Sequence, residues 1–304
     1  MLGPQSAKPS LRAVMDRLQV TGPVVSITAG WRDSEGELDD LRKDVGCPVE
    51  DLGIYQRAEA IFAQEPELLA LHRERQDKLL ELQQLYRIRL NAAMAAARKL
   101  LRTNGQADLL RLEQRAAIAQ VRALDRHHVR RIAAIHRDFN QRLAGITVPT
   151  AREQREAVHR QARAAGLVLI SGGHVAVLLN RIRLFRLEPL LAVKPIIAWS
   201  AGAMVLGDRI VLFHDNAPQG RRDAEVLDAG LGIVEGLVPL PHARDRLDWS
   251  SRTRMALFSR RFAPSRCVTL DGGSQIHFAD GRVTSAIGCS VMLRTGRKRK
   301  WVPR

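Results

Sequence analysis

The chain has 304 residues, of which 45% are hydrophobic and 26% charged. This composition is that of an ordinary folded protein, and it excludes the disordered, collagen-like and membrane-spanning classes. Lysine and arginine outnumber aspartate and glutamate by 48 to 32, so the formal net charge is +16. The length is about twice that of a common domain, so either two smaller domains or one domain with an insertion is expected. The positive charge favours acidic substrates or polyanions.

Three cysteines, Cys47, Cys267 and Cys289, stand far apart and form no C-x-x-C pair. Neither a zinc site nor a disulfide framework is therefore indicated. No glycine-rich nucleotide-binding motif occurs at a strand-to-helix turn, so we predict no cofactor and no metal. Charged residues interrupt the region where a signal peptide would need its apolar run, and no segment is long and apolar enough to cross a membrane. We expect a cytoplasmic protein without membrane contact.

The first zone, up to about residue 54, has an α/β pattern. An amphipathic run that starts at Leu11 precedes the apolar segment Val24-Val25-Ser26-Ile27-Thr28, which ends at Ala29-Gly30. A continuous apolar run of this kind is typical of a strand buried on both faces of a parallel sheet. Its partner strands must come from later in the chain.

The second zone, residues 55–145, predicts a helical hairpin. It contains no glycine or proline between Glu67 and Asn104, and apolar residues recur at three- and four-residue spacing on both sides of Thr103-Asn104-Gly105. Each arm of about 37 residues would extend about 55 Å. We expect this coiled coil to be too long to lie flat on a small domain, and so to project or to pair with a second copy. Its interleaved charges favour a solvated dimerisation arm; an arm that grips nucleic acid or a protein partner is the alternative.

The third zone resumes the α/β pattern. A helix over 151–165 leads into the strand Gly166-Leu167-Val168-Leu169-Ile170, and Pro195-Ile196-Ile197-Ala198-Trp199 forms a second strand. Strands alternating with helices on both sides of the hairpin predict one mostly parallel sheet. We therefore expect a discontinuous α/β domain of residues 1–54 and 146–293, an inserted hairpin at 55–145, and a basic tail at 294–304.

Ser200 lies at an abrupt junction between a predicted strand and a predicted helix. The segment Ala198-Trp199-Ser200-Ala201-Gly202 is rich in small residues, which leave room for a tight turn that lifts the hydroxyl out of the sheet. This is the arrangement of a nucleophile elbow; the alternative is a packing turn at the head of a helix. Ser171-Gly172-Gly173 ends the preceding strand in a similar way, and its amides could face a developing oxyanion together with the N–H of Ala201.

Further segments follow in a fixed order. They are Leu169-Ile170-Ser171-Gly172-Gly173, Ala198-Trp199-Ser200-Ala201-Gly202-Ala203-Met204, Gly230-Leu231-Gly232-Ile233, Pro241-His242-Ala243-Arg244, Gly281-Arg282-Val283 and Ile287-Gly288. As a set they resemble the dipeptidase E and cyanophycinase family of serine peptidases. The resemblance covers about residues 166–293 and implies the three-layer, mostly parallel α/β fold of the class I glutamine amidotransferases. The hairpin is no part of the family's usual pattern. A glutaminase is excluded because the elbow holds serine where that chemistry needs cysteine.

The resemblance implies a role for each matching residue. Ser200 is the expected nucleophile and His242 the expected general base, and the amides of Gly173 and Ala201 form the expected oxyanion hole. The candidates for substrate binding are Gly172, Trp199 and Arg244. His242 is preferred as the base over the other histidines considered, which are His174, His214 and His277, while His127 and His128 on the hairpin are interpreted as surface residues.

The acid of the triad departs from the family pattern. By resemblance the acid belongs in the segment Val268-Thr269-Leu270-Asp271-Gly272-Gly273, and Gly272 stands where glutamate is expected. Asp271 is adjacent, although a shift of one residue points a side chain to the other face of a strand. Asp215 lies at a spacing after the serine where some family members carry an aspartate. Asp215 and Asp271 are therefore both candidates, and a hydrolase that lacks only this acid keeps part of its activity.

Two functions follow. The first is a Ser-His hydrolase that cleaves an amide of a small peptide through an acyl-enzyme on Ser200, and the family precedent suggests peptides that contain aspartate. The second is a hydrolase-like scaffold with weakened turnover that acts as a binding or assembly module for nucleic acid or a protein partner. On that hypothesis the basic run from Arg294 to Trp301 holds phosphates, with Trp301 stacked on a base; the alternative is a disordered end. The expected partners are a small peptide substrate, a second copy bound through the hairpin and, on the second hypothesis, nucleic acid.

Overall fold

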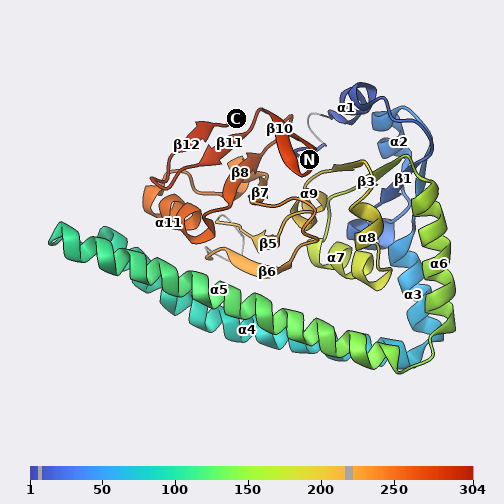
Figure 1. Ribbon diagram of the computed structural model, residues 1–304, viewed down its shortest axis with the longest axis horizontal. Helices are drawn as coiled ribbons and strands as arrows, with labels where there is room; N and C mark the ends of the chain where they lie inside the picture. Colours follow the sequence, from blue (N-terminus) through green and yellow to red (C-terminus); the bar gives the residue numbers. More distant parts are fainter. Residues whose placement is uncertain (6–8, 216–221, 304) are drawn as a thin grey trace.

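A four-stranded parallel sheet organises the first part of the fold (Figure 1). The computed structural model describes residues 1–5, 9–215 and 222–303. The strand order is β2-β1-β3-β4, and Val24 of β1 lies beside Leu167 of β3. The strand predicted before the hairpin therefore pairs directly with the strand predicted after it. The bounds are β1 (Val24–Ile27), β2 (Val49–Asp51), β3 (Leu167–Ile170) and β4 (Ile196–Ala198).

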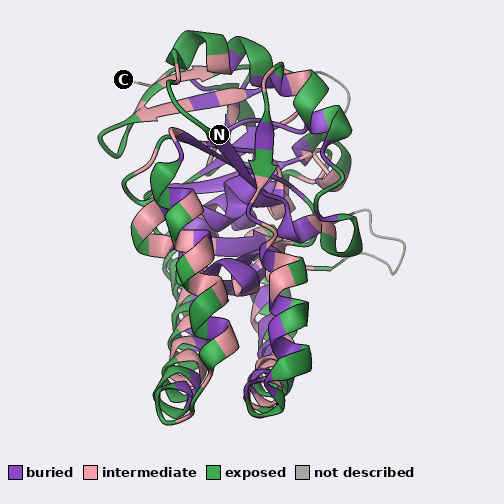
Figure 2. Ribbon diagram, turned by 90° about the vertical axis from the view of Figure 1, so that its right-hand side faces the viewer, coloured by how far each residue is buried: buried purple, intermediate pink, exposed green. Residues whose placement is uncertain are grey.

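Helices cover both faces of this sheet. Val24 and Leu169 share an apolar cluster with Leu41 of α2, whereas Val168 shares another with Ile61 of α3. Alternate residues of each strand thus enter opposite cores, which confirms an α/β fold with a buried parallel sheet. Figure 2 shows the buried residues concentrated on the strands, while the outward faces of the helices are exposed. The helices are α1 (Leu11–Leu18), α2 (Asp39–Val45), α3 (Ile54–Gln64), α6 (Pro149–Ala164), α7 (Val175–Leu184), α8 (Glu188–Leu191) and α9 (Ala201–Val205), and a 3-10 turn, η1, spans Ala29–Ser34.

The remaining strands do not extend this sheet, so the prediction of a single sheet is wrong. Over the described ranges there are four hydrogen-bonded sheets: the parallel sheet, a sheet of order β12-β11-β8-β7, and the pairs β5-β6 and β9-β10. Leu2 connects two of them by isolated bridges to Trp199 and Gln275, because a segment of a few residues occupies the space between β4 and β9. The bounds are β5 (Arg209–Leu212), β6 (Glu225–Ala229), β7 (Leu237–Pro241), β8 (Arg266–Leu270), β9 (Gln275–Ala279), β10 (Arg282–Ile287), β11 (Ser290–Met292) and β12 (Lys298–Lys300).

Two long helices, α4 (Pro66–Arg102) and α5 (Ala107–Ala144), form a helix pair of 37 and 38 residues. Pro66 occupies the first turn of α4, where its missing N–H has no intrahelical partner to lose. Leu90 of α4 and Val121 of α5 are fully buried between the helices. The two predicted long helices are thus present, whereas coiled-coil geometry and pairing with a second copy stay predictions. In the described ranges no helix, these two included, is both long and apolar enough to cross a membrane.

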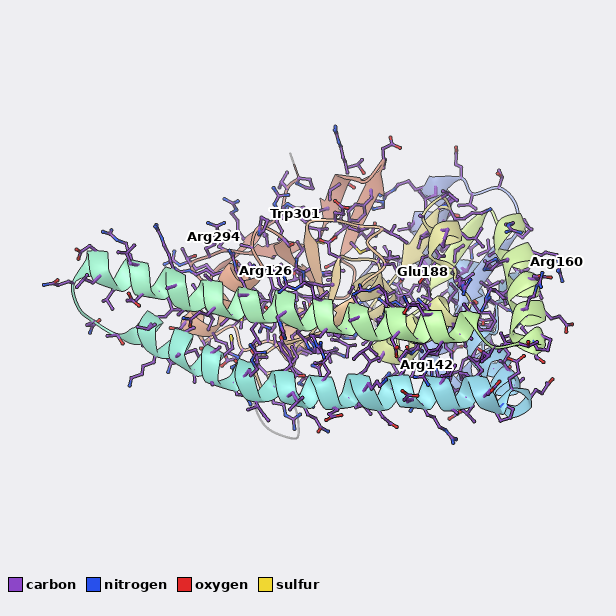
Figure 3. The ribbon with its side chains drawn as sticks, turned by 60° about the horizontal axis from the view of Figure 1, so that its bottom comes forward. Arg126, Arg142, Arg160, Glu188, Arg294 and Trp301 are labelled. Atoms are coloured by element: carbon purple, nitrogen blue, oxygen red, sulfur yellow. The ribbon has the colours of Figure 1, made fainter. Side chains whose placement is uncertain are left out.

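The helix pair runs along the α/β body, and its free end, with the turn between α4 and α5, extends past the body (Figure 1). The expectation that the pair would project therefore holds for this end alone. Leu257 of α11 (Arg252–Phe262) belongs to the apolar cluster of the pair. The C-terminal strands and α11 lengthen the body in the direction of the helices, and this provides the surface that a small domain would lack. Charged residues remain on the outer faces, among them Arg126 and Arg142 (Figure 3).

His128 is buried, so its interpretation as a surface residue is wrong. Only 1% of it is exposed, its Nε2 lies 2.8 Å from Gln83 Oε1, and its ring stacks on Tyr86 with centroids 3.9 Å apart. Burial lowers the pKa of His128 to about 4, so the ring is neutral near pH 7. The adjacent His127 is exposed, as expected.

The basic C-terminal segment is folded, so the disordered end and the base-stacking role of Trp301 are both wrong. β12 pairs with β11 in antiparallel register, and Trp301 donates its backbone N–H to Cys289 at 3.0 Å. Trp301 is 6% exposed and belongs to the main apolar core, where burial of its large ring stabilises the fold. The exposed charges of this segment are Arg294, Arg297 and the three residues of β12, and residue 304 lies outside the described residues.

Candidate active site

Ser200 occupies a strained turn between β4 and α9. Its φ and ψ are 50° and −119°, a conformation that non-glycine residues rarely adopt. The turn is held close to β3, since Trp199 donates its N–H to the carbonyl of Ile170 at 3.1 Å. A Cβ at Gly202 would lie 2.2 Å from that same carbonyl oxygen, so only glycine permits this approach. The local sequence thus forms the predicted elbow geometry.

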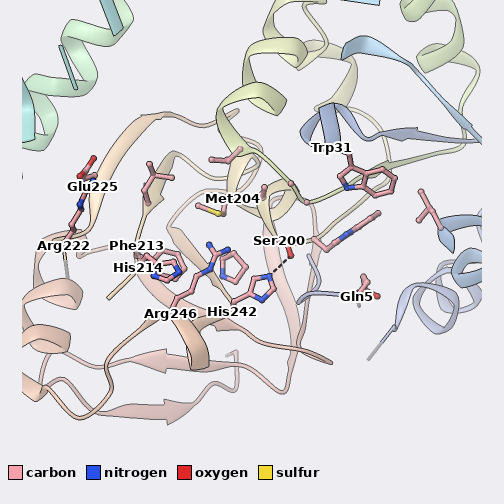
Figure 4. Close-up of a pocket in the computed structure, with 18 of the residues that line it drawn as sticks. Gln5, Trp31, Ser200, Met204, Phe213, His214, Arg222, Glu225, His242 and Arg246 are labelled. Carbon is pink, nitrogen blue, oxygen red and sulfur yellow. Dashed lines mark hydrogen bonds between the residues drawn. The ribbon is translucent and has the colours of Figure 1, made fainter. Parts of the chain in front are cut away.

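His242 follows β7 directly and turns toward the serine. Its φ of 56° is left-handed, and its N–H donates to the carbonyl of Leu270 at the end of β8. Ser200 Oγ and His242 Nε2 lie 3.4 Å apart (Figure 4). This hydrogen bond is long, as those between catalytic groups often are in proteins without bound substrate. The fold therefore brings together two residues that are 42 positions apart in the chain.

The glycine loop after β3 packs against the serine. A Cβ on Gly172 would lie 2.9 Å from the Cβ of Ser200, so glycine is required for this contact as well. In the portion of the chain that the structure describes, the N–H groups of Gly173 and Ala201 donate to no other protein group. Both residues line the same cavity as Ser200, so two backbone donors without a protein partner are available there. An oxyanion hole needs such donors.

Asp215 does not reach the histidine ring. Its carboxylate accepts a 2.7 Å hydrogen bond from Arg254 Nε and a 2.9 Å hydrogen bond from the N–H of Asp248. Its own N–H donates to the carbonyl of Arg246 at 2.7 Å, at the end of the short helix α10 (Ala243–Arg246). Asp215 therefore fixes the segment that follows His242.

Asp271 and Gly272 lie next to the histidine segment. β7 and β8 are parallel, and Pro241 is in register with Leu270, so the residues that follow the two strands are neighbours. Asp271 Oδ1 accepts the backbone N–H of Arg244 at 2.9 Å. Across residues 1–5, 9–215 and 222–303, the His242 ring makes a hydrogen bond only with Ser200. No carboxylate of the described residues is therefore bonded to its second ring nitrogen.

The sequence pattern of Peptidase family S51 matches residues 118–286, more than half of the chain. The chain belongs to Peptidase family S51. This is the family of dipeptidase E and cyanophycinase, so the resemblance stated from the sequence is confirmed and the chain is a member of a serine peptidase family. The match includes Ser200 and His242 and begins within α5, so α4 lies outside it. No curated protein matches the chain closely enough to name.

The charge state of His242 is set by its surroundings in this S51 site. Burial lowers the pKa of His242 below its ordinary value of 6.5, and the positive charge of Arg246 lowers it further. The negative charges of Asp245 and Asp271 act in the opposite direction. The ring is therefore neutral near pH 7, which is the form that accepts a proton from serine.

If His242 acts as the general base, kcat/KM is expected to fall on the acid side with an apparent pKa below 6.5, because only a neutral imidazole can accept a proton. Arg246→Gln removes one cause of the lowered pKa, so the acid limb should move to higher pH. The pH profile of kcat/KM, recorded from about pH 4 to about pH 9, checks both statements. An acid limb at or above 6.5, or one that stays in place in Arg246→Gln, would contradict them.

The S51 site opens into an active-site cavity of about 740 Å³. Gly172, Gly173, Trp199 and Ala201 line it with Ser200 and His242, whereas Arg244 is not among the lining residues. Figure 4 shows the labelled side chains extending from Trp31 and Gln5 on one side, past the serine and histidine, to Arg222 and Glu225 on the other. The lining residues that the sequence did not indicate include Gln5, Trp31, Arg87, Phe213, Arg222, Asp223 and Glu225. No motif marks them, because they come from distant segments that only the fold brings together.

Proposed function

We propose that this member of family S51 cleaves an amide bond of a small peptide through an acyl-enzyme on Ser200. The contact between Ser200 Oγ and His242 Nε2, beside two available backbone N–H groups, carries the proposal. His242 accepts the hydroxyl proton while Oγ attacks the carbonyl carbon of the substrate. The oxyanion so formed accepts hydrogen bonds from the N–H groups of Gly173 and Ala201.

The imidazolium then donates its proton to the leaving amine, and the C–N bond breaks to give the acyl-enzyme and a free amine. In the second half, His242 accepts a proton from water, and the hydroxide attacks the ester carbonyl. Collapse of this intermediate returns the proton to Ser200 Oγ and releases the acid. Gly172 and Trp199, in the wall of the active-site cavity, would contact the bound peptide, and an aspartate side chain would be attracted by Arg246.

In this mechanism His242 lacks the carboxylate that would orient its ring. A carboxylate bonded to the second ring nitrogen normally fixes the tautomer and stabilises the imidazolium. Here the nearest support is the field of Asp245 and Asp271, and Arg246 opposes it. We therefore infer slow turnover. The same observation favours a second candidate function, a scaffold that binds its ligand without turning it over.

A serine-reactive fluorophosphonate separates the two candidates. The wild-type chain is expected to be labelled, and Ser200→Ala should abolish labelling and lower peptide hydrolysis by about 10³-fold or more. Ser285→Ala, in strand β10, serves as the control and should keep both activities. Intact-mass spectrometry after labelling and a screen with short peptides provide the measurements. A wild-type chain that is not labelled, or a Ser200→Ala chain labelled equally, would reject the peptidase and leave the binding scaffold.

A further inference from the structure

A second cavity adjoins the active-site cavity. It has a volume of about 720 Å³ and is bounded by α4 on one side and by the α/β body on the other. The two cavities have four lining residues in common, Arg87, Arg222, Asp223 and Glu225. The space available beside Ser200 therefore continues past these four side chains toward the helix pair.

Helix α4 lines the second cavity with a row of side chains that donate hydrogen bonds. Arg87, Asn91, Arg98 and Arg102 line the cavity, and their spacing of four, seven and four residues places them on one face of the helix. A span of fifteen residues corresponds to about 22 Å along the helix axis. The opposite wall comes from the body and includes Arg222, Ser251 and Arg254.

Positive charge is in excess in this second cavity. Its lining holds five arginines and two carboxylates. Arg87 pairs with Glu225 at 2.7 Å, Arg98 pairs with Asp223, and Arg254 pairs with Asp215 at 2.6 Å. The first two pairs hold the start of β6 and the residues just before it, and the third holds the segment after His242. They account for every carboxylate that lines the cavity.

Arg102 and Arg222 are the two lining arginines left over. Neither forms an ion pair with a carboxylate anywhere in the residues that the structure describes, and both are exposed residues that line the cavity. Guanidinium groups that share a cavity repel one another unless an anion lies between them. A guanidinium also offers paired N–H donors that match the two oxygens of a carboxylate. The unmatched charge thus has the geometry of a site for an acidic group.

We propose that the second cavity extends the substrate site and binds side-chain carboxylates of an acidic peptide, at residues remote from the bond that Ser200 would cleave. The choice of a peptide rests on the proposed function, since the two cavities are continuous. The site depends on α4, which lies outside the residues matched by the family pattern. It is thus a feature of this chain that the family match does not supply.

The test uses Ser200→Ala protein and two peptides, Glu-Glu-Ala-Ala-Glu-Glu and the same peptide with glutamine in place of glutamate. Calorimetric titration should show that the acidic peptide binds at least about tenfold more tightly. Arg102→Gln combined with Arg222→Gln should remove most of this preference, because it weakens binding of the acidic peptide far more than binding of the glutamine peptide. A matched loss of two charges, Arg111→Gln with Arg115→Gln, alters α5 at a separate groove and should leave the preference intact.

Equal affinity for the two peptides would overturn the proposal. So would an equal loss in both double variants, because the preference would then reflect only the overall charge of the protein. Hydrolysis of the same peptides by the wild-type chain is measured in parallel. If the binding pattern is as expected but neither peptide is cleaved, the second cavity is supported and the peptidase function is rejected, so the two failures are distinguishable.

Discussion

Replacing Arg261 with alanine is expected to lower the free energy of unfolding by about 3–5 kcal/mol. The Arg261 side chain is fully buried and binds both oxygens of Asp125, each at 2.7 Å. It also donates to Tyr86 Oη at 2.7 Å and to the carbonyl of Ala224 at 2.6 Å. One guanidinium thus joins α11 to both long helices and to the segment before β6. Without Arg261, the buried carboxylate of Asp125 is left without a counter-charge, and burial of an unpaired charge strongly lowers the free energy of unfolding.

Urea unfolding followed by circular dichroism measures this change. Arg142→Ala is the matched control, because Arg142 of the same helix pair binds Glu74 in an exposed ion pair that solvent screens (Figure 3). Its effect should be far smaller. Arg261→Met combined with Asp125→Leu should recover part of the stability, since neither charge is then buried alone. If Arg261→Ala unfolds at the same urea concentration as the wild-type chain, the helix pair is not coupled to the body through this contact.

Introducing glutamate at position 272 is expected to raise kcat/KM about tenfold or more, provided that the chain is a peptidase. Gly272 follows β8 beside the His242 segment, and a Cβ built there meets nothing within 4 Å. A carboxylate at this place would orient the imidazole and stabilise its protonated form, the two functions of a triad acid. It would also raise the pKa of His242, so the acid limb of the pH profile should move to higher pH.

Gly272→Gln is the control for this gain, because it has the same shape without the charge. Steady-state kinetics on a short peptide, together with the pH profile, gives both readouts. The proposal requires that glutamate and glutamine differ in rate and in the position of the acid limb. If the two variants behave alike, the absence of a triad acid does not limit the rate. The lack of a carboxylate bonded to His242 then has another role.

Much of the site could be predicted because its signals are local. The elbow at Ser200 depends on small residues packed within a few positions, and the glycine at position 202 meets the carbonyl of Ile170 on the adjacent strand. The two long helices are likewise encoded by periodic apolar residues and by the absence of glycine and proline over the first arm. His242 was found through the family resemblance, which supplies the order of motifs along the chain.

Contacts between distant segments could not be predicted in the same way. Whether Asp215 contacts His242 or Arg254 depends on how the segment after β5 packs against the end of β7 and against α11. The sequence of any one of these segments does not predict that packing. Trp301 follows a run of basic residues and His128 lies among polar ones, so both were expected at the surface. Both are buried, because neighbouring elements cover them.

The sequence by itself determined the α/β class, the long helices, the serine elbow and the family, since each depends on residue types at fixed short spacings or on motif order. Tertiary structure alone decided that the helix pair lies along the body, that the strands divide into separate sheets, and that Arg87 of α4 reaches the active-site cavity. The physical reason is that burial and charge pairing between elements depend on their placement in three dimensions, and many placements are compatible with the same local pattern.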